Sequence, residues 1–247
     1  YFNHYNISKG YFFGEYLKDK YIIWQKYLDN NVDPKAKTLS IASGRCINEL
    51  KLISNNFNIT CSDIEVPKFY ERSKKIFGNY DYIKFNITKD EINSKFDCIY
   101  SLSAFYIFSN SDLEKIINNI NKVLNKNGVL ILDYGGAEDN LTSYLLHEIY
   151  LIVETYLIYY LSKILNKKFG FRFNKNWGYR RKNEEIVQFI ERFGFELINI
   201  NEYDELTELK RSFFIRSIIK YIPYSVKIFK ILGKNIPYIR IFKFKKI

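Results

Sequence analysis

Short apolar runs alternate with amphipathic segments along the first half of the chain. Five runs have the length of buried strands, at 37–42, 58–63, 82–86, 96–102 and 129–133. Around and between them, apolar residues recur every three or four positions, which predicts helices at 12–30, 46–55, 67–77 and 111–124. Strands that alternate with helices at this spacing predict an α/β fold with a doubly wound parallel sheet.

The first predicted strand runs into a tight loop of small residues, Ala42-Ser43-Gly44, and a helix is predicted to follow. Small residues at such a place let the backbone approach a ligand closely. The second predicted strand ends at Asp63, and a carboxylate there can accept hydrogen bonds from both hydroxyls of a ribose. Together the two features predict a pocket for an adenosine-containing cofactor.

The loop suits a dinucleotide poorly. The three glycines of the dinucleotide-binding fingerprint correspond to Ala42, Gly44 and Ile47, and Ile47 does not favour close packing of helix on strand. A cofactor without phosphate, such as S-adenosylmethionine, fits better. On these residues the chain resembles the class I S-adenosylmethionine-dependent methyltransferases, over about residues 36–202.

This resemblance implies a Rossmann-like sheet that is mostly parallel and has an antiparallel closing strand. Residues 96–101 resemble the family's fourth strand, whose carboxyl end faces the transferred methyl group, and 124–132 resemble the turn and fifth strand. The closing pair would be 196–201 with 212–216. The cofactor-binding residues implied are Ser40, Ala42, Ser43, Gly44, Asp63, Ile64, Asn86, Ile87, Ser101 and Leu102.

Several positions depart from the family's pattern, which has more glycine where Ala42 and Cys46 stand. Ser40 stands where the family usually has an acid, so the cofactor's ammonium group would be recognised by backbone carbonyls or by another acid such as Glu49. Asn86 stands where the family often places an aspartate against the adenine amine, and an amide oxygen can accept the same hydrogen bond.

An insert at about 134–182 is expected to recognise the methyl acceptor. Its apolar stretch 141–165 is interrupted by His147, Glu148 and Glu154, which argues against a membrane span and favours a buried helix that caps the pocket. A basic and aromatic cluster follows, which either holds a phosphate or carboxylate of the substrate or forms a solvated loop. The cluster consists of Arg172, Tyr179, Arg180 and Arg181.

An alcohol acceptor benefits from a base. His147 is the first candidate, although an isolated histidine on an apolar helix is more often a packing residue. Tyr134, at the tip of the fifth strand, is the second. No metal is expected, because the three cysteines lack metal-ligand spacing and are typical of buried residues in a reducing cytoplasm.

Positive charge is concentrated at the end of the chain. The 247 residues carry a net charge of +11, and 209–247 hold eleven basic residues and no acidic one. Mixed with aliphatic residues, these charges suit an anionic membrane, a nucleic-acid groove or an extension packed on the body. We expect a methyltransferase domain at 1–220 and a basic C-terminal extension at 221–247.

These features favour a cytoplasmic methyltransferase, attached peripherally to the inner membrane face by its extension. The expected reaction is O-methylation of a small-molecule or glycan-type acceptor. Three alternatives stay open: an NAD(P)-dependent oxidoreductase or epimerase, an RNA methyltransferase that uses the basic extension, and a binding module without catalytic activity.

Overall fold

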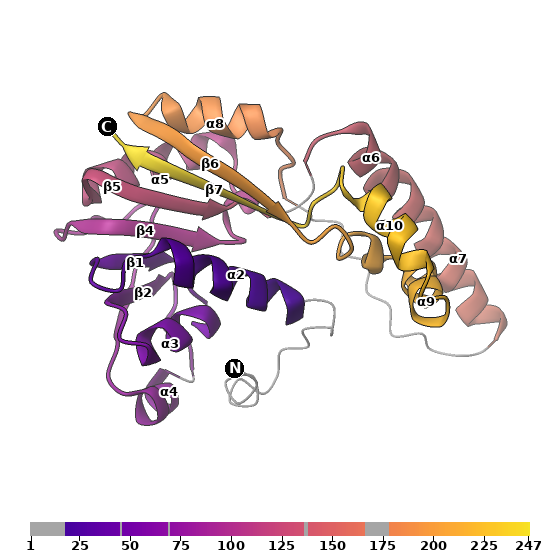
Figure 1. The fold of residues 1–247 in the computed structure, drawn as a ribbon, viewed down its shortest axis with the longest axis horizontal. Coiled ribbons are helices and arrows are strands. Elements are labelled where there is room, and N and C mark those ends of the chain that lie inside the picture. The colour runs from indigo at the N-terminus through magenta and orange to yellow at the C-terminus, as the bar shows by residue number, and fades with distance from the viewer. Residues whose placement is uncertain (1–17, 45, 69, 136–137, 166–177) are drawn as a thin grey trace.

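The computed structural model describes residues 18–44, 46–68, 70–135, 138–165 and 178–247. Arg172, one of the expected substrate-binding residues, lies outside these ranges. Within them the chain forms a seven-stranded sheet (Figure 1). Its strands are, in spatial order, β3 (Asp81–Lys84), β2 (Ile59–Asp63), β1 (Thr38–Ile41), β4 (Phe96–Leu102), β5 (Leu124–Asp133), β7 (Ile239–Lys246) and β6 (Phe195–Tyr203).

The first five strands in this order are parallel to one another, whereas β7 is antiparallel to both β5 and β6. The fold class predicted from the sequence is therefore confirmed. The strand order reverses its direction between β1 and β4, and in open α/β sheets such a reversal leaves a crevice beyond the carboxyl ends of the strands.

Helices cover both faces of the sheet. One face carries α2 (Lys18–Asn31), α3 (Ile47–Ser54) and α4 (Tyr70–Phe77), and the other carries α5 (Asn110–Val123) and α8 (Asn183–Glu191). The α2 side of the core includes Trp24, Leu28, Leu50, Cys61, Tyr100 and Ile241. The α5 side includes Ile99, Ile116, Ile120, Leu130, Ile190 and Phe242.

Helix α5 begins slightly before the expected position. Its N-cap is Ser109, whose Oγ accepts a hydrogen bond from the backbone N–H of Asp112 at 3.2 Å. The apolar pattern located the helix but not its capping residue.

The closing antiparallel strand is not the expected one. Residues 212–216 do not form a strand, because Ser212 caps helix α9 (Phe213–Tyr221) and its Oγ accepts from the backbone N–H of Ile215 at 2.9 Å. The partner of β6 is instead β7, which lies between β5 and β6. The segment 221–247 is therefore not a separate extension, since its last strand belongs to the sheet.

A group of helices projects beyond the ends of the parallel strands (Figure 1). We call it the helical lobe. It contains α6 (Leu141–Tyr144), the π-helical segment η3 (Leu145–Tyr150), α7 (Leu151–Ile164), the short 3-10 helix η4 (Leu209–Arg211), α9 and α10 (Ser225–Gly233). Leu146, Leu151, Leu209 and Ile236 form its small core.

The prediction that 141–165 form a buried helix capping the pocket is wrong. The segment is helical, but only one side of it packs against the rest of the lobe. At its two ends, Leu141 is 72% exposed and Ile164 is 78% exposed.

Candidate active site

A cavity of about 370 Å³ lies beyond the carboxyl ends of β1 and β4. Among the residues that line it are Ser40, Ala42, Ser43, Gly44 and Leu102, all expected from the sequence to bind a cofactor. Others are Lys20, Trp24, Glu49, Ser103, Tyr106 and Tyr238. Its volume is in the range of small-molecule and cofactor sites.

The loop after β1 has an unusual backbone. Ala42, Gly44 and Cys46 all adopt left-handed conformations, with φ values of 55°, 52° and 53°. Such a conformation is unfavourable for a residue other than glycine and persists only where its surroundings hold it. Here Ser43 supplies that support: its Oγ donates to the Ser40 carbonyl at 2.9 Å and accepts from the Ser62 N–H at 3.1 Å.

Asp63 stands beside this loop at the tip of β2. One carboxylate oxygen accepts a hydrogen bond from the Gly44 backbone N–H at 2.8 Å, and the other accepts from the Ile64 N–H at 2.7 Å. Each carboxylate oxygen can accept a second hydrogen bond. The acid is thus fixed next to the loop and retains the capacity to bind a pair of hydroxyls.

The carboxylate of Glu49 lies beside Ser40, the residue that stands where the family usually has an acid. Glu49, from α3, lines the cavity, and its Oε1 accepts hydrogen bonds from Ser40 Oγ at 2.8 Å and Tyr100 OH at 3.2 Å. Burial raises the pKa of Glu49. A cation in the cavity would stabilise its ionised form.

Asn86 is placed differently from the expectation. Its side-chain oxygen accepts from both the backbone N–H of Thr88, at 3.1 Å, and the Thr88 hydroxyl, at 2.7 Å. These two bonds use both acceptor sites of the amide oxygen, which are therefore not available to an adenine amine. Neither Asn86 nor Ile87 lines the cavity. Ser101 is fully buried within β4, and Ile64 is exposed outside the cavity.

Lys20 is the main site residue that the sequence did not reveal. This lysine of α2 is 3% exposed, and its Nζ donates to Ser103 Oγ at 2.8 Å. The ammonium position lies over the rings of Trp24 and Tyr238, at 4.3 and 4.1 Å from their centroids. Burial lowers the pKa of Lys20, an effect that the nearby Asp133 partly opposes.

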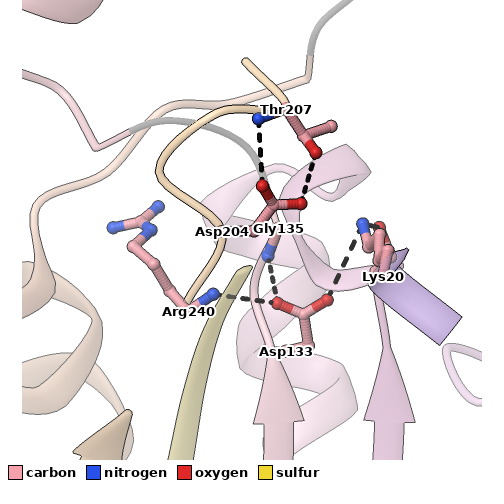
Figure 2. A network of polar contacts seen from close by, with 7 residues as sticks. Lys20, Asp133, Gly135, Asp204, Thr207 and Arg240 are labelled. Carbon is pink, nitrogen blue, oxygen red and sulfur yellow. Dashed lines mark hydrogen bonds and ion pairs between the residues drawn. The ribbon is translucent and has the colours of Figure 1, made fainter. Parts of the chain in front are cut away.

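Asp133, at the tip of β5, is the acidic partner of Lys20. Its Oδ1 accepts from the backbone N–H groups of Gly135, at 3.0 Å, and Arg240, at 3.2 Å (Figure 2). These bonds hold the side chain between β5 and β7. Burial raises the pKa of Asp133.

A family model described as a methyltransferase domain matches residues 39–132, which include β1 to β4, most of β5, the loop, Glu49 and Asp63. Residues 39–132 thus carry a methyltransferase domain, which agrees with the resemblance to the class I S-adenosylmethionine-dependent methyltransferases. No curated protein sequence matches that of this methyltransferase.

Several solved structures share the fold of this methyltransferase. Magnesium protoporphyrin IX methyltransferase from Synechocystis PCC 6803 is 13% identical, with a TM-score of 0.58 over 100% of this chain and 94% of that one. A 1,6-didemethyltoxoflavin-N1-methyltransferase from Burkholderia thailandensis is 9% identical, with a TM-score of 0.58 over 99% and 84%. The N-methyltransferase NodS from Bradyrhizobium japonicum WM9 is 11% identical, with a TM-score of 0.52 over 94% and 96%.

His147 does not take the place expected of a base in this methyltransferase. It is buried in the helical lobe and does not line the cavity. Its Nε2 lies 3.4 Å from Glu208 Oε2, while burial, together with Arg211 and Arg180, lowers the pKa of His147 to about 3. The alternative of a packing histidine fits this environment.

Tyr134 also faces away from the cavity. Its hydroxyl donates to the carbonyl of Tyr179 at 3.2 Å and accepts a hydrogen bond from the guanidinium of Arg181. Its ring packs in the core beside α8, with Leu132, Ile186 and others. These contacts indicate a structural role rather than proton transfer.

Tyr179, Arg180 and Arg181 line a different, open hollow of about 640 Å³, together with Asn110 and Arg192. The Arg180 guanidinium pairs with Glu148 at 2.9 Å, and Arg181 Nη2 donates to the carbonyl of Phe108 at 3.0 Å. The expected substrate-binding arginines are therefore brought together, but away from the cavity that holds Lys20.

Proposed function

We propose that this methyltransferase transfers a methyl group from S-adenosylmethionine to an oxygen of a small-molecule acceptor. The single observation that carries the proposal is the shared cavity. The Glu49 carboxylate lines the cavity near the end of β1, and Asp63 stands beside the adjoining loop, bonded to the Gly44 N–H. The buried amine of Lys20 lines the cavity near the end of β4.

The cofactor fits the residues on the first side. Asp63 would accept the ribose hydroxyls, and Glu49 would bind the ammonium group of the amino-acid portion. Among the described residues, the buried Glu49 carboxylate accepts hydrogen bonds from the two hydroxyl groups of Ser40 and Tyr100 and forms no ion pair, and it suits a positively charged ligand. When bound, the cofactor supplies a methyl group on a positively charged sulfur.

Lys20 would act on the acceptor. Its amine points into the cavity next to Ser103, which follows the end of β4 in a left-handed conformation with φ 57°. Lys20 Nζ would accept the proton of the acceptor hydroxyl, whose oxygen would receive the methyl group that the cofactor supplies. A lysine with a lowered pKa is suited to this role because its amine is neutral nearer to physiological pH.

The aromatic residues favour a small acceptor. Trp24, Tyr106 and Tyr238 line the cavity around Lys20 and would exclude water from the reacting atoms. The cavity volume suits a compact molecule better than an extended glycan. Two similar structures, the magnesium protoporphyrin IX methyltransferase and the 1,6-didemethyltoxoflavin-N1-methyltransferase, are named for small-molecule acceptors.

Methyl transfer to a panel of small molecules tests the proposal. The full chain is incubated with S-adenosylmethionine that carries an isotope-labelled methyl group and with phenols, aliphatic alcohols, carboxylic acids and amines of similar size. We expect label in an oxygen-linked methyl group, identified by mass spectrometry. Label found only in nitrogen-linked methyl groups would contradict transfer to oxygen.

A further inference from the structure

Helix α7 turns an apolar face outward. Its buried positions are Leu151, Glu154 and Ile158, which share one side of the helix. Most of its exposed positions are apolar or aromatic, with Lys163 the charged one in the described helix, and they are between 44% and 78% exposed: Val153, Tyr156, Leu157, Tyr159, Tyr160, Leu161 and Ile164. This polarity is the reverse of an ordinary surface helix, in which the outward face is charged.

Glu154 explains why the helix is held in this orientation. Its carboxylate, on the inward side, accepts hydrogen bonds from Ser212 Oγ at 2.8 Å and from the backbone N–H groups of Phe213, at 3.1 Å, and Phe214, at 2.8 Å. The acid therefore caps the first turn of α9 and fixes α7 to it. The apolar face points outward as a consequence of this packing.

Helices α9 and α10 lie beside α6 and α7 (Figure 1) and add positive charge. Their exposed basic residues are Arg216, Lys220, Lys227, Lys230 and Lys234. None of these five forms an ion pair with a described carboxylate, and 209–247 contain no acid. Exposed aliphatic residues alternate with the lysines of α10, where Ile228, Ile231 and Leu232 are more than half exposed.

We propose that the helical lobe docks on the surface of an anionic lipid bilayer. The outward residues of α7 would enter the boundary between headgroups and acyl chains, and the basic residues of α9 and α10 would contact lipid phosphates. Apolar residues combined with lysine and arginine are typical of helices that lie in a membrane interface.

The charges favour a bilayer over a second copy of the chain. Two lobes brought face to face would bring like charges together, and residues 209–247 offer no acid to compensate them. An anionic lipid surface complements the charges instead. Within the described part of the chain, no helix is long and apolar enough to cross a membrane, so the contact would be with the surface.

The lobe adjoins the cavity. Arg211, in η4, lies over the ring of Tyr238 at 5.1 Å from its centroid, and Lys20 Nζ of the cavity lies 4.1 Å from the same centroid. A docked lobe would therefore hold the cavity close to the bilayer.

Vesicle flotation with the full chain tests the proposal. We expect the protein to float with vesicles made of phosphatidylglycerol and phosphatidylcholine in equal parts, and to do so less at high salt. Vesicles of phosphatidylcholine alone should bind it much more weakly. Failure to float with the anionic vesicles at low salt would overturn the proposal.

Two sets of variants separate the apolar and basic contributions. Leu157→Glu with Leu161→Glu should abolish flotation, whereas Ile198→Glu should not, although Ile198 on the edge strand β6 is 49% exposed and Leu157 is 51% exposed. Reversing the charge of Lys220, Lys227 and Lys230 should lower vesicle affinity roughly a hundredfold. The matched control reverses Lys84, Lys115 and Lys126, which are exposed outside the lobe.

Each variant is first checked for an unchanged thermal unfolding midpoint and unchanged binding of S-adenosylhomocysteine. Equal flotation of the lobe variants and their controls would overturn the proposal. A wild-type dimer in light scattering that the Leu157 and Leu161 changes dissociate, with no flotation, would assign the face to a second copy. Salt-sensitive RNA binding without flotation would assign it to nucleic acid.

Discussion

Lys20 Nζ lies 3.9 Å from Asp133 Oδ2, and both side chains are almost completely buried. The pair joins α2, near one end of the chain, to the tip of β5. Burial lowers the pKa of Lys20 and raises the pKa of Asp133, so both shifts favour the neutral forms.

Replacing Lys20 tests its role as the base. Lys20→Met should lower kcat by about 10²–10⁴-fold and leave the affinity for S-adenosylhomocysteine unchanged. Lys26→Met, on the exposed side of the same helix, is the matched control. In the wild type, kcat/KM should rise with pH through the lowered pKa of Lys20, because the neutral amine is the active form. Full turnover by Lys20→Met would remove Lys20 from the mechanism.

Glu49 should recognise only the charged part of the cofactor. Glu49→Gln should weaken binding of S-adenosylhomocysteine by roughly ten- to a hundredfold, since hydrogen bonds to charged groups contribute about 1.5–3 kcal/mol. Binding of 5′-methylthioadenosine, which lacks the amino-acid group, should not change. Calorimetry with both ligands checks this, with Glu71→Gln as an exposed control. An equal loss of affinity for the two ligands would show that the substitution disturbs the cavity as a whole.

Asp63 should give the complementary result. Asp63→Asn keeps the size of the side chain and removes its charge, so both S-adenosylhomocysteine and 5′-methylthioadenosine should bind roughly ten- to a hundredfold more weakly. Both ligands carry the ribose. Unchanged affinities in the same calorimetric titration would place the ribose elsewhere.

The His147 environment predicts a pH-dependent stability. The unfolded chain has an ordinary histidine pKa, about 6.5, whereas that of the folded protein is lowered to about 3. Between these values the unfolded state binds the extra proton, so stability falls as the pH drops. From pH 7 to pH 5 this histidine should remove about 2 kcal/mol from the free energy of unfolding.

Urea unfolding of the wild type and of His147→Asn at both pH values measures this contribution. The loss between pH 7 and pH 5 should be smaller in the variant by about that amount, because asparagine does not titrate. The same pH dependence in both proteins would mean that His147 is not held neutral in the fold.

The central sheet and the cofactor loop could be predicted because their signals are local. Each apolar run of β1 to β5 is continuous in the sequence. The small residues 42–44 directly follow β1, and Asp63 ends the next strand, β2. The last strand was missed for a physical reason. Residues 239–246 mix apolar and basic side chains, and the charges of Arg240 and Lys243 obscured a strand whose apolar residues are buried on both faces of the sheet.

Lys20 could not be predicted, since its role depends on contacts with Ser103 and Asp133 from distant strands. The same dependence on contacts between distant residues explains why the sequence placed His147 wrongly. Its place after the fifth strand suggested a position over the cavity, but the helix packs in the lobe, where Glu208 lies beside the imidazole. Sequence alone identified the carboxylates near the loop and did not establish which ionisable groups line the acceptor side.

The most direct measurement is a calorimetric titration of the full chain with S-adenosylhomocysteine, compared with NAD. We expect one molecule of S-adenosylhomocysteine to bind per chain, NAD not to bind, and Asp63→Asn to lose most of the affinity. A chain that binds NAD but not S-adenosylhomocysteine, or whose affinity for S-adenosylhomocysteine is unaffected by changes at both Asp63 and Glu49, would contradict the assignment of this cavity to the cofactor.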